Sequence, residues 1–313
     1  MPLPSPPGRP PGWIPPGQRG DPPVILGGAK VTDTGHRVLG FNTSGATGFV
    51  DGHQVNQMLT LLGDYNVRLF MPPMESTLAI TDPVQDMGPR GQHGQAMIAF
   101  DQPCVNRGNI MAWRFNGVDE WIEIPDNDLF SFGDGLVDYP FSVGCWVKWS
   151  GVDGAEKDII SKWDAATPRF EWRLIIGTTE ALAFWVRDTS VAGSFKGRVT
   201  PGNLVDANIW RFVCGTYDGR GGPAPHDGIT IYSGTSALWE GTVDTADNAG
   251  AGIYVAMENT AQPVMIGASD VLAGPNPSNW YPGEMCLAFI VGGALPAGVV
   301  ERVYRLGVEV MQL

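Results

Sequence analysis

The sequence predicts an all-β protein built as a sandwich of two antiparallel sheets. Ile122 and Ile124 lie in a short apolar run that ends at Pro125, because proline cannot donate to a strand ladder. After a polar, glycine-bearing loop, apolar side chains recur at every second position: Phe141, Val143, Cys145 and Val147. A period of two buries one face of a strand. The 42 glycines and 26 prolines between such runs are typical of a turn-rich β protein.

Further strand-like segments follow in an order that matches one known family. They are residues 114–126 (RFNGVDEWIEIPD), 140–148 (PFSVGCWVK), 158–164, 170–176, 181–188, 209–219 (IWRFVCGTYDG), 263–269 and 281–306. Together they resemble the laminin-G-like jelly roll of the concanavalin A-like lectin/glucanase superfamily. The resemblance implies a two-sheet antiparallel jelly-roll domain over residues 106–307, whose relatives bind sugars. Residues 297–306 are predicted to form its closing helix, with Gly307 as the C-cap and 308–313 as a tail.

Two segments are expected before the jelly roll. Residues 1–23 hold ten prolines, which favour an extended polyproline arm. Trp13 and Ile14 would anchor this arm on a neighbouring subunit, and a disordered tail is the alternative. Residues 24–105 contain short strand candidates and one helical stretch, Val55 to Leu62, with little periodic apolar sequence. We expect a small, irregular, β-rich assembly segment that packs on other chains, with a small independent β domain as the alternative.

Charge and cysteine usage narrow the classes of partner. The formal net charge of −13 repels nucleic acid and anionic membranes, and no apolar run approaches the roughly 20 residues that a spanning helix needs. The four cysteines lack metal-ligand spacing, so buried reduced thiols are expected: Cys104, Cys145, Cys214 and Cys286. The first residues lack the apolar stretch of a secretory signal, which leads us to expect synthesis in a host cytoplasm.

Catalytic groups are not evident in the sequence. Jelly-roll glucanases place carboxylates at alternate positions of one strand, whereas Asp119, Glu120 and Glu123 are split between two faces and are expected to be solvated edge charges. The four histidines lie among glycines without a nucleophile beside them. We therefore expect no enzymatic activity and no cofactor. The family resemblance leaves one metal open, calcium on the loop oxygens of Asp126, Asn127 and Asp128, against ordinary turn chemistry.

Alternation in three strands predicts a ligand-binding surface. If these strands pair in one sheet, six outward side chains gather on it: Trp146, Lys148, Glu171, Arg173, Trp185 and Arg187. Tryptophan rings would stack on sugars while the charged groups bind hydroxyls. A protein–protein contact or burial under a loop is the alternative, because tryptophan and arginine also dominate protein interfaces.

These expectations combine into one functional hypothesis. Domains similar to residues 112–307 occur in bacteriophage minor tail proteins, so we expect a virion protein at the tail tip. Its partners would be other virion proteins through residues 1–105, further copies of itself, and a host-surface glycan. A capsid decoration protein with a lacing arm is one alternative. A glycan hydrolase or a cellular lectin of the same superfamily is another.

Overall fold

The computed structural model describes most of the chain after residue 51. The described ranges are 52–73, 77–101, 104–107, 110–151, 154–164, 169–192, 194–269 and 277–313. Four two-residue strands precede them, β1 (Ile25–Leu26), β2 (Ala29–Lys30), β3 (Val38–Leu39) and β4 (Phe49–Val50). The predicted arm, with Trp13 and Ile14, lies outside the described residues.

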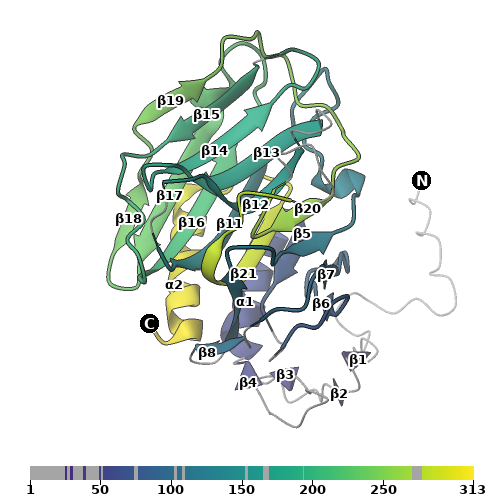
Figure 1. The fold of residues 1–313 in the computed structure, drawn as a ribbon, viewed down its shortest axis with the longest axis vertical. Coiled ribbons are helices and arrows are strands. Elements are labelled where there is room, and N and C mark those ends of the chain that lie inside the picture. The colour runs from purple at the N-terminus through teal and green to yellow at the C-terminus, as the bar shows by residue number, and fades with distance from the viewer. Residues whose placement is uncertain are drawn as a thin grey trace, which may run out of the picture.

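Two antiparallel sheets form the predicted jelly-roll sandwich (Figure 1). The nine-stranded sheet has the order β19 (Ala246–Ala249), β15 (Phe195–Val199), β14 (Leu182–Arg187), β13 (Arg169–Ile176), β12 (Lys157–Asp164), β20 (Val264–Ile266), β10 (Ile122–Ile124), β7 (Gly94–Ala96) and β6 (Pro83–Val84). The eight-stranded sheet has the order β18 (Trp239–Thr242), β17 (Ile229–Thr235), β16 (Trp210–Tyr217), β11 (Phe141–Trp149), β21 (Pro282–Val291), β9 (Ile110–Asn116) and β8 (Val105–Arg107), and its eighth strand, β5 (Val67–Met71), also pairs with β21. Short 3-10 helices lie at Asp128–Phe130 and Pro225–Gly228.

The main core lies between the sheets. It includes every residue that alternation predicts to point inward from β11, β13 and β14: Phe141, Val143, Cys145, Val147, Trp172, Leu174, Ile176, Leu182, Phe184 and Val186. Phe141 stacks on Phe132 with ring centroids 4.1 Å apart and contacts the rings of Trp172, Phe184 and Tyr217. All four cysteines lie in the described ranges, are buried and form no disulfide, as predicted.

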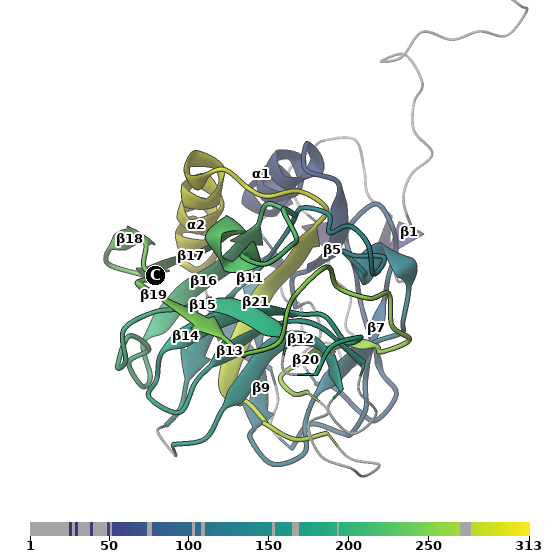
Figure 2. The same cartoon turned by 90° about the horizontal axis from the view of Figure 1, so that it is seen from above.

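Two helices cover the outer face of the eight-stranded sheet (Figure 2). Helix α1 (Gly52–Gly63) confirms the helical prediction for Val55 to Leu62. Helix α2 (Ala297–Met311) runs past the predicted end at Gly307, and the left-handed residue that ends it is Gln312. The predicted tail is thus mostly the last turn of α2. Neither helix is long and apolar enough to cross a membrane.

Gly307 has a packing role in place of the predicted C-cap role. A Cβ atom at this position would lie 2.0 Å from Nε1 of Trp146, so only glycine lets α2 approach this ring. Tyr304, one turn earlier, stacks on the same indole with centroids 5.6 Å apart. The helix therefore passes Gly307 in contact with β11, and Met311 in its last turn lies against Cys286 of β21.

The boundary predicted at residue 105 is wrong for residues 52–104. Strand β5 pairs with the second half of β21, beside β9, which pairs with the first half. Strands β6 and β7 extend the nine-stranded sheet through β10. Leu69, Met71 and Val84 enter the main core, whereas Val55 and Leu62 pack under α2. The segment has little periodicity because its apolar surface is buried by pairing with strands far along the chain.

Candidate functional site

The six residues predicted to share one surface occupy three places. Strand β11 belongs to the eight-stranded sheet, whereas β13 and β14 belong to the nine-stranded sheet, so Trp146 and Lys148 lie across the sandwich from Arg173, Trp185 and Arg187. The prediction of a single sheet is therefore wrong. Trp146 does point away from the main core, but α2 covers it and leaves it 0% exposed.

Glu171 is also misplaced by strict alternation. The register between β12 and β13 shifts where Lys162 lies opposite Trp172 and Trp163 lies opposite Phe170. Glu171 sits at this bulge and is fully buried, away from Arg173. A bulge adds one residue to a strand and so breaks the alternation of side chains.

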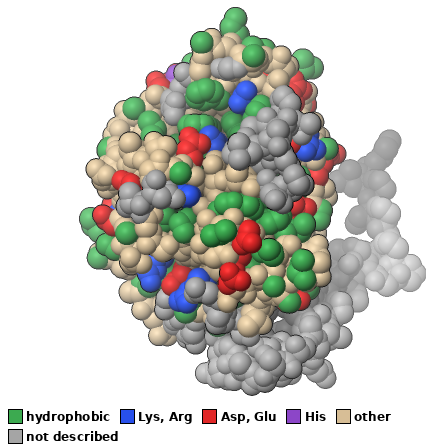
Figure 3. Space-filling model, viewed as in Figure 1, with side chains coloured by type: hydrophobic (Ala, Val, Ile, Leu, Met, Phe, Trp, Pro, Cys, Tyr) green, Lys and Arg blue, Asp and Glu red, His purple; other side chains and the backbone are tan. Residues whose placement is uncertain are grey.

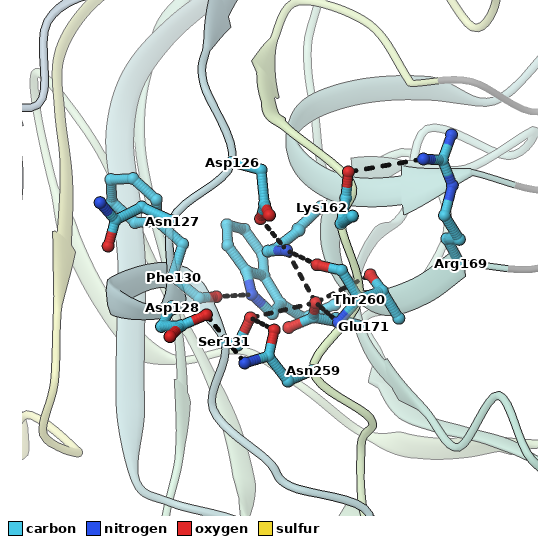
Figure 4. Close-up of polar contacts among 12 residues, drawn as sticks. Asp126, Asn127, Asp128, Phe130, Ser131, Lys162, Arg169, Glu171, Asn259 and Thr260 are labelled. Carbon is cyan, nitrogen blue, oxygen red and sulfur yellow. Dashed lines mark hydrogen bonds and ion pairs between the residues drawn. The ribbon is translucent and has the colours of Figure 1, made fainter.

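Glu171 joins a buried polar cluster around Lys162, which Figure 4 shows beside the loop that follows β10. The Lys162 ammonium lies 2.8 Å from Oε1 of Glu171 and donates to Asp126 Oδ1 (2.9 Å) and to the carbonyl of Thr260 (2.7 Å). Thr260 N and Oγ1 both donate to the same Glu171 oxygen, and Ser131 Oγ donates to it at 3.2 Å.

The ammonium of Lys162 and the carboxylate of Glu171 form the fully buried ion pair of this cluster. Burial raises the pKa of the Glu171 carboxyl, and the adjacent Lys162 ammonium opposes that rise. A buried pair of this kind is costly to break, since removal of one partner leaves an uncompensated charge in the interior. The cluster thus fastens the 126–131 and 259–260 loops to β12 and β13.

The three predicted calcium ligands are engaged by protein groups. Asp126 binds Lys162, Asn127 Oδ1 accepts from the backbone N–H of Leu129, and Asp128 Oδ1 accepts from Asn259 Nδ2 at 3.0 Å. Across the ranges that the structure describes, no three His, Cys, Asp or Glu side chains gather as a metal site requires. Calcium at this loop stays a prediction.

The carboxylates near the opening strand also have structural partners. Glu120, expected to be solvated, is buried and accepts from the backbone N–H groups of Asn116 and Asp101. Asp119 accepts from Nδ2 of Asn116 at 2.9 Å. Burial raises the pKa of both Glu120 and Glu123. The expectation of solvated edge charges is therefore wrong for Glu120, which closes the turn between β9 and β10.

A stacked group of cations and aromatic rings lies on the outer face of the nine-stranded sheet. This guanidinium–aromatic cluster consists of Trp163, Phe170, Arg173, Trp185, Arg187 and Phe195. Cζ of Arg173 lies 4.2 Å from the ring centre of Trp185 and 4.7 Å from that of Trp163. Cζ of Arg187 lies 3.5 Å from the ring centre of Phe170 and 5.6 Å from that of Trp163.

Local packing orients the rings of this cluster. Trp185 lies opposite Gly197 in β15, where a Cβ atom would come within 2.3 Å of the indole, so the ring can lie across the strand and stack on Phe195. Trp185, Arg187 and Phe195 remain partly exposed, whereas Trp163 and Phe170 are buried. Alternation identifies Arg173, Trp185 and Arg187, but it misses Trp163 and Phe170 because they flank the bulge.

The two arginines of the cluster differ in their charge partners. Arg173 donates to Glu156 at 2.9 Å and lies 3.6 Å from Asp158, whose pKa is raised by burial. The pKa of Arg187 is lowered by burial and by the nearby Arg173. In the described part of the chain no carboxylate forms an ion pair with Arg187. One guanidinium is thus neutralised and the other is not.

The fold and these surfaces define a lectin-like jelly roll. The family model described as the concanavalin A-like lectin/glucanases superfamily matches residues 116–297, and the chain belongs to this superfamily. No curated protein matches the chain.

Among solved structures, the similar ones include binding domains of a mosquitocidal protein and of botulinum neurotoxins. The binding domain of Paraclostridial Mosquitocidal Protein 1 is 14% identical, with a TM-score of 0.45 over 78% of this chain and 52% of that chain. The botulinum neurotoxin serotype D binding domain is 13% identical, with a TM-score of 0.49 over 77% and 52%. The serotype D ligand binding domain in complex with N-acetylneuraminic acid is 12% identical, with a TM-score of 0.45 over 79% and 52%. The chain spans about half the length of these structures.

Proposed function

We propose that this chain is a non-enzymatic virion protein, a bacteriophage minor tail protein whose sandwich binds a host-surface glycan at the tail tip. The observation that carries the proposal is the guanidinium–aromatic cluster. The outer face of the eight-stranded sheet is closed by α1 and α2, whereas the cluster brings Trp185, Arg187 and Phe195 partly to the surface of the other sheet. Aromatic rings beside hydrogen-bond donors suit the apolar face and the hydroxyls of a sugar ring.

The carboxylates support a binding role over hydrolysis. Glycoside hydrolysis needs an acid and a second carboxylate that reach the scissile bond. Glu171 has no exposed surface and is held by Lys162 and Thr260, while Glu120 is held by backbone N–H groups. Both groups are occupied in holding loops.

Two features support a place in a virus particle. The four buried cysteines form no disulfide, which suits a protein that folds in a reducing cytoplasm, as virion proteins do before lysis. The proline-rich residues 1–23 have the composition of an extended arm that could lie along neighbouring subunits. Electron microscopy of intact particles labelled with an antibody against this chain tests the location. Label on the tail tip supports the proposal, and label over the shell points to capsid decoration.

Glycan binding is tested with three alanine variants on an array of cell-wall oligosaccharides. Trp185→Ala should weaken binding by about 1 to 3 kcal/mol, as truncation of an anchoring aromatic does, and should leave the fold intact. Trp239→Ala is the matched control, because Trp239 is also partly buried but lies on the covered sheet beside Tyr304. Trp172→Ala should destabilise the domain strongly, since this ring is in the main core. Equal binding by wild type and Trp185→Ala would remove the cluster as the glycan site.

A further inference from the structure

We propose that Arg187 is the anchor of an anion-binding subsite, and that the ligand of this domain is an acidic saccharide, a sugar bearing a carboxylate or a sulfate. This inference rests on the proposed glycan-binding function and adds the chemical class of the ligand. Its basis is a difference between two neighbouring arginines: Arg173 forms ion pairs with carboxylates, whereas Arg187 forms none with the described residues.

Arg187 carries a positive charge that the described residues do not neutralise. Its guanidinium lies on Phe170 and Trp163, and among the described residues the charged group that shifts its pKa is Arg173, which repels it. Burial removes part of its hydration as well. Such a partly desolvated cation binds an incoming oxyanion with a more favourable free energy than a hydrated surface lysine does, because charge-assisted hydrogen bonds strengthen where water is excluded.

The geometry suits a planar or tetrahedral oxyanion. Contact with Phe170 at 3.5 Å and with Trp163 at 5.6 Å from Cζ restrains the Arg187 guanidinium, whose planar fork of donors matches carboxylate or sulfate oxygens in pairs. Trp185, on the same strand two residues earlier, is partly exposed and can contact the sugar ring that carries the acid. Arg173 cannot serve as the anchor, because Glu156 and Asp158 already occupy it.

The charge of the whole chain limits the size of the ligand. With a net charge of −13, the protein repels a long polyanion, and Figure 3 shows basic and acidic side chains interspersed on the face in view. Beyond about 10 Å this repulsion is screened at 0.1 M salt, so a short acidic oligosaccharide is affected far less than a polymer. The subsite should therefore accept one acidic residue within a short or mostly neutral glycan.

The test uses matched oligosaccharide pairs and the full-length protein. Isothermal titration compares galacturonate, glucuronate and N-acetylneuraminate oligosaccharides with their methyl esters, and sulfated oligosaccharides with their unsulfated parents. At least one acid should bind about tenfold more tightly than its neutral counterpart, as expected for one charge-assisted pair. Preference for the carboxylates or for the sulfates identifies which oxyanion is bound.

Two variants link the preference to Arg187. Arg187→Gln should abolish the preference for the acid over its neutral form, and Arg187→Lys should retain part of that preference, because the charge stays but the fork is lost. Arg305→Gln, at an exposed arginine of α2 on the other side of the sandwich, is the control and should bind as wild type does.

Each remaining outcome is decisive. If wild-type protein binds the acidic sugars and their neutral forms equally tightly, the anionic subsite is overturned, while the proposed glycan binding is not. A preference that survives Arg187→Gln overturns the assignment of Arg187. Binding of none of the sugars, acidic or neutral, overturns the proposed function and this inference together.

Discussion

Replacement of Gly307 by alanine should destabilise the protein, although helix propensity alone favours the change. Alanine is preferred over glycine inside a helix by about 1 kcal/mol. Here, however, the new Cβ would lie 2.0 Å from Nε1 and 2.9 Å from Cε2 of the fully buried Trp146 ring. Overpacking of this severity costs up to about 3 kcal/mol, which leaves a net loss of about 2 kcal/mol. In a domain of this size that loss lowers Tm by roughly 4 to 8 °C.

Gly298 in the first turn of the same helix is the matched control. A Cβ atom there meets nothing within 4 Å, so Gly298→Ala should be neutral or stabilise the protein by up to about 1 kcal/mol. Guanidinium unfolding followed by tryptophan fluorescence measures both variants. The free energy of unfolding should fall for Gly307→Ala and should stay the same or rise for Gly298→Ala.

A double-mutant cycle separates steric packing from the capping role that the sequence suggests. A C-cap glycine would lose a similar free energy on replacement, but that loss would not depend on Trp146. If the ring is the cause, the penalty of Gly307→Ala should shrink in a Trp146→Phe background, where the indole is absent. Strict additivity of the two substitutions, or a Gly307→Ala variant as stable as wild type, would refute the packing argument.

Three further predictions concern the core. Burial raises the pKa of Asp138 above its ordinary value of 3.8, so the stabilisation that this side chain contributes is complete below pH 3.8 and is lost as the pH rises through the raised pKa. The difference in unfolding free energy between wild type and Asp138→Asn should therefore narrow with rising pH. A difference that stays constant with pH would contradict this prediction. The four buried thiols should react with a maleimide only after denaturation, and rapid labelling of the native protein would show that they are accessible. Trp172→Ala should cost about 3 to 5 kcal/mol in chemical unfolding, because the ring is fully buried and Nε1 donates to the carbonyl of Phe130 at 2.9 Å, whereas a loss below 1 kcal/mol would place it outside the core.

Local periodicity predicts the inward residues of β11, β13 and β14 correctly, because alternation depends only on the geometry of one strand. It does not predict which sheet a strand joins. That choice separates Trp146 from Trp185, and it depends on pairing between distant segments. Nor does it reveal the bulge that turns Glu171 inward, since a bulge depends on the partner strand.

The predicted domain boundary at residue 105 failed for a related reason. Strand β5 has a short apolar sequence, VRLFM, that looks too small for a core, but β21 supplies its partner from the far end of the chain. In the same way, Gly307 has the usual sequence signal of a helix end, and only the position of Trp146 shows that its role is close packing.

The pairing of β5 with β21 means that the recognisable lectin region is not a transferable module. The family match covers residues 116–297, yet a fragment cut at these limits would lose β5, β7, β9 and both helices. Trp146 and the outer edge of β21 would then face water. Any fusion, display scaffold or shortened version of this sandwich must carry residues 52–313, and a natural recombination that exchanged only the family-matched part would deliver an incomplete domain.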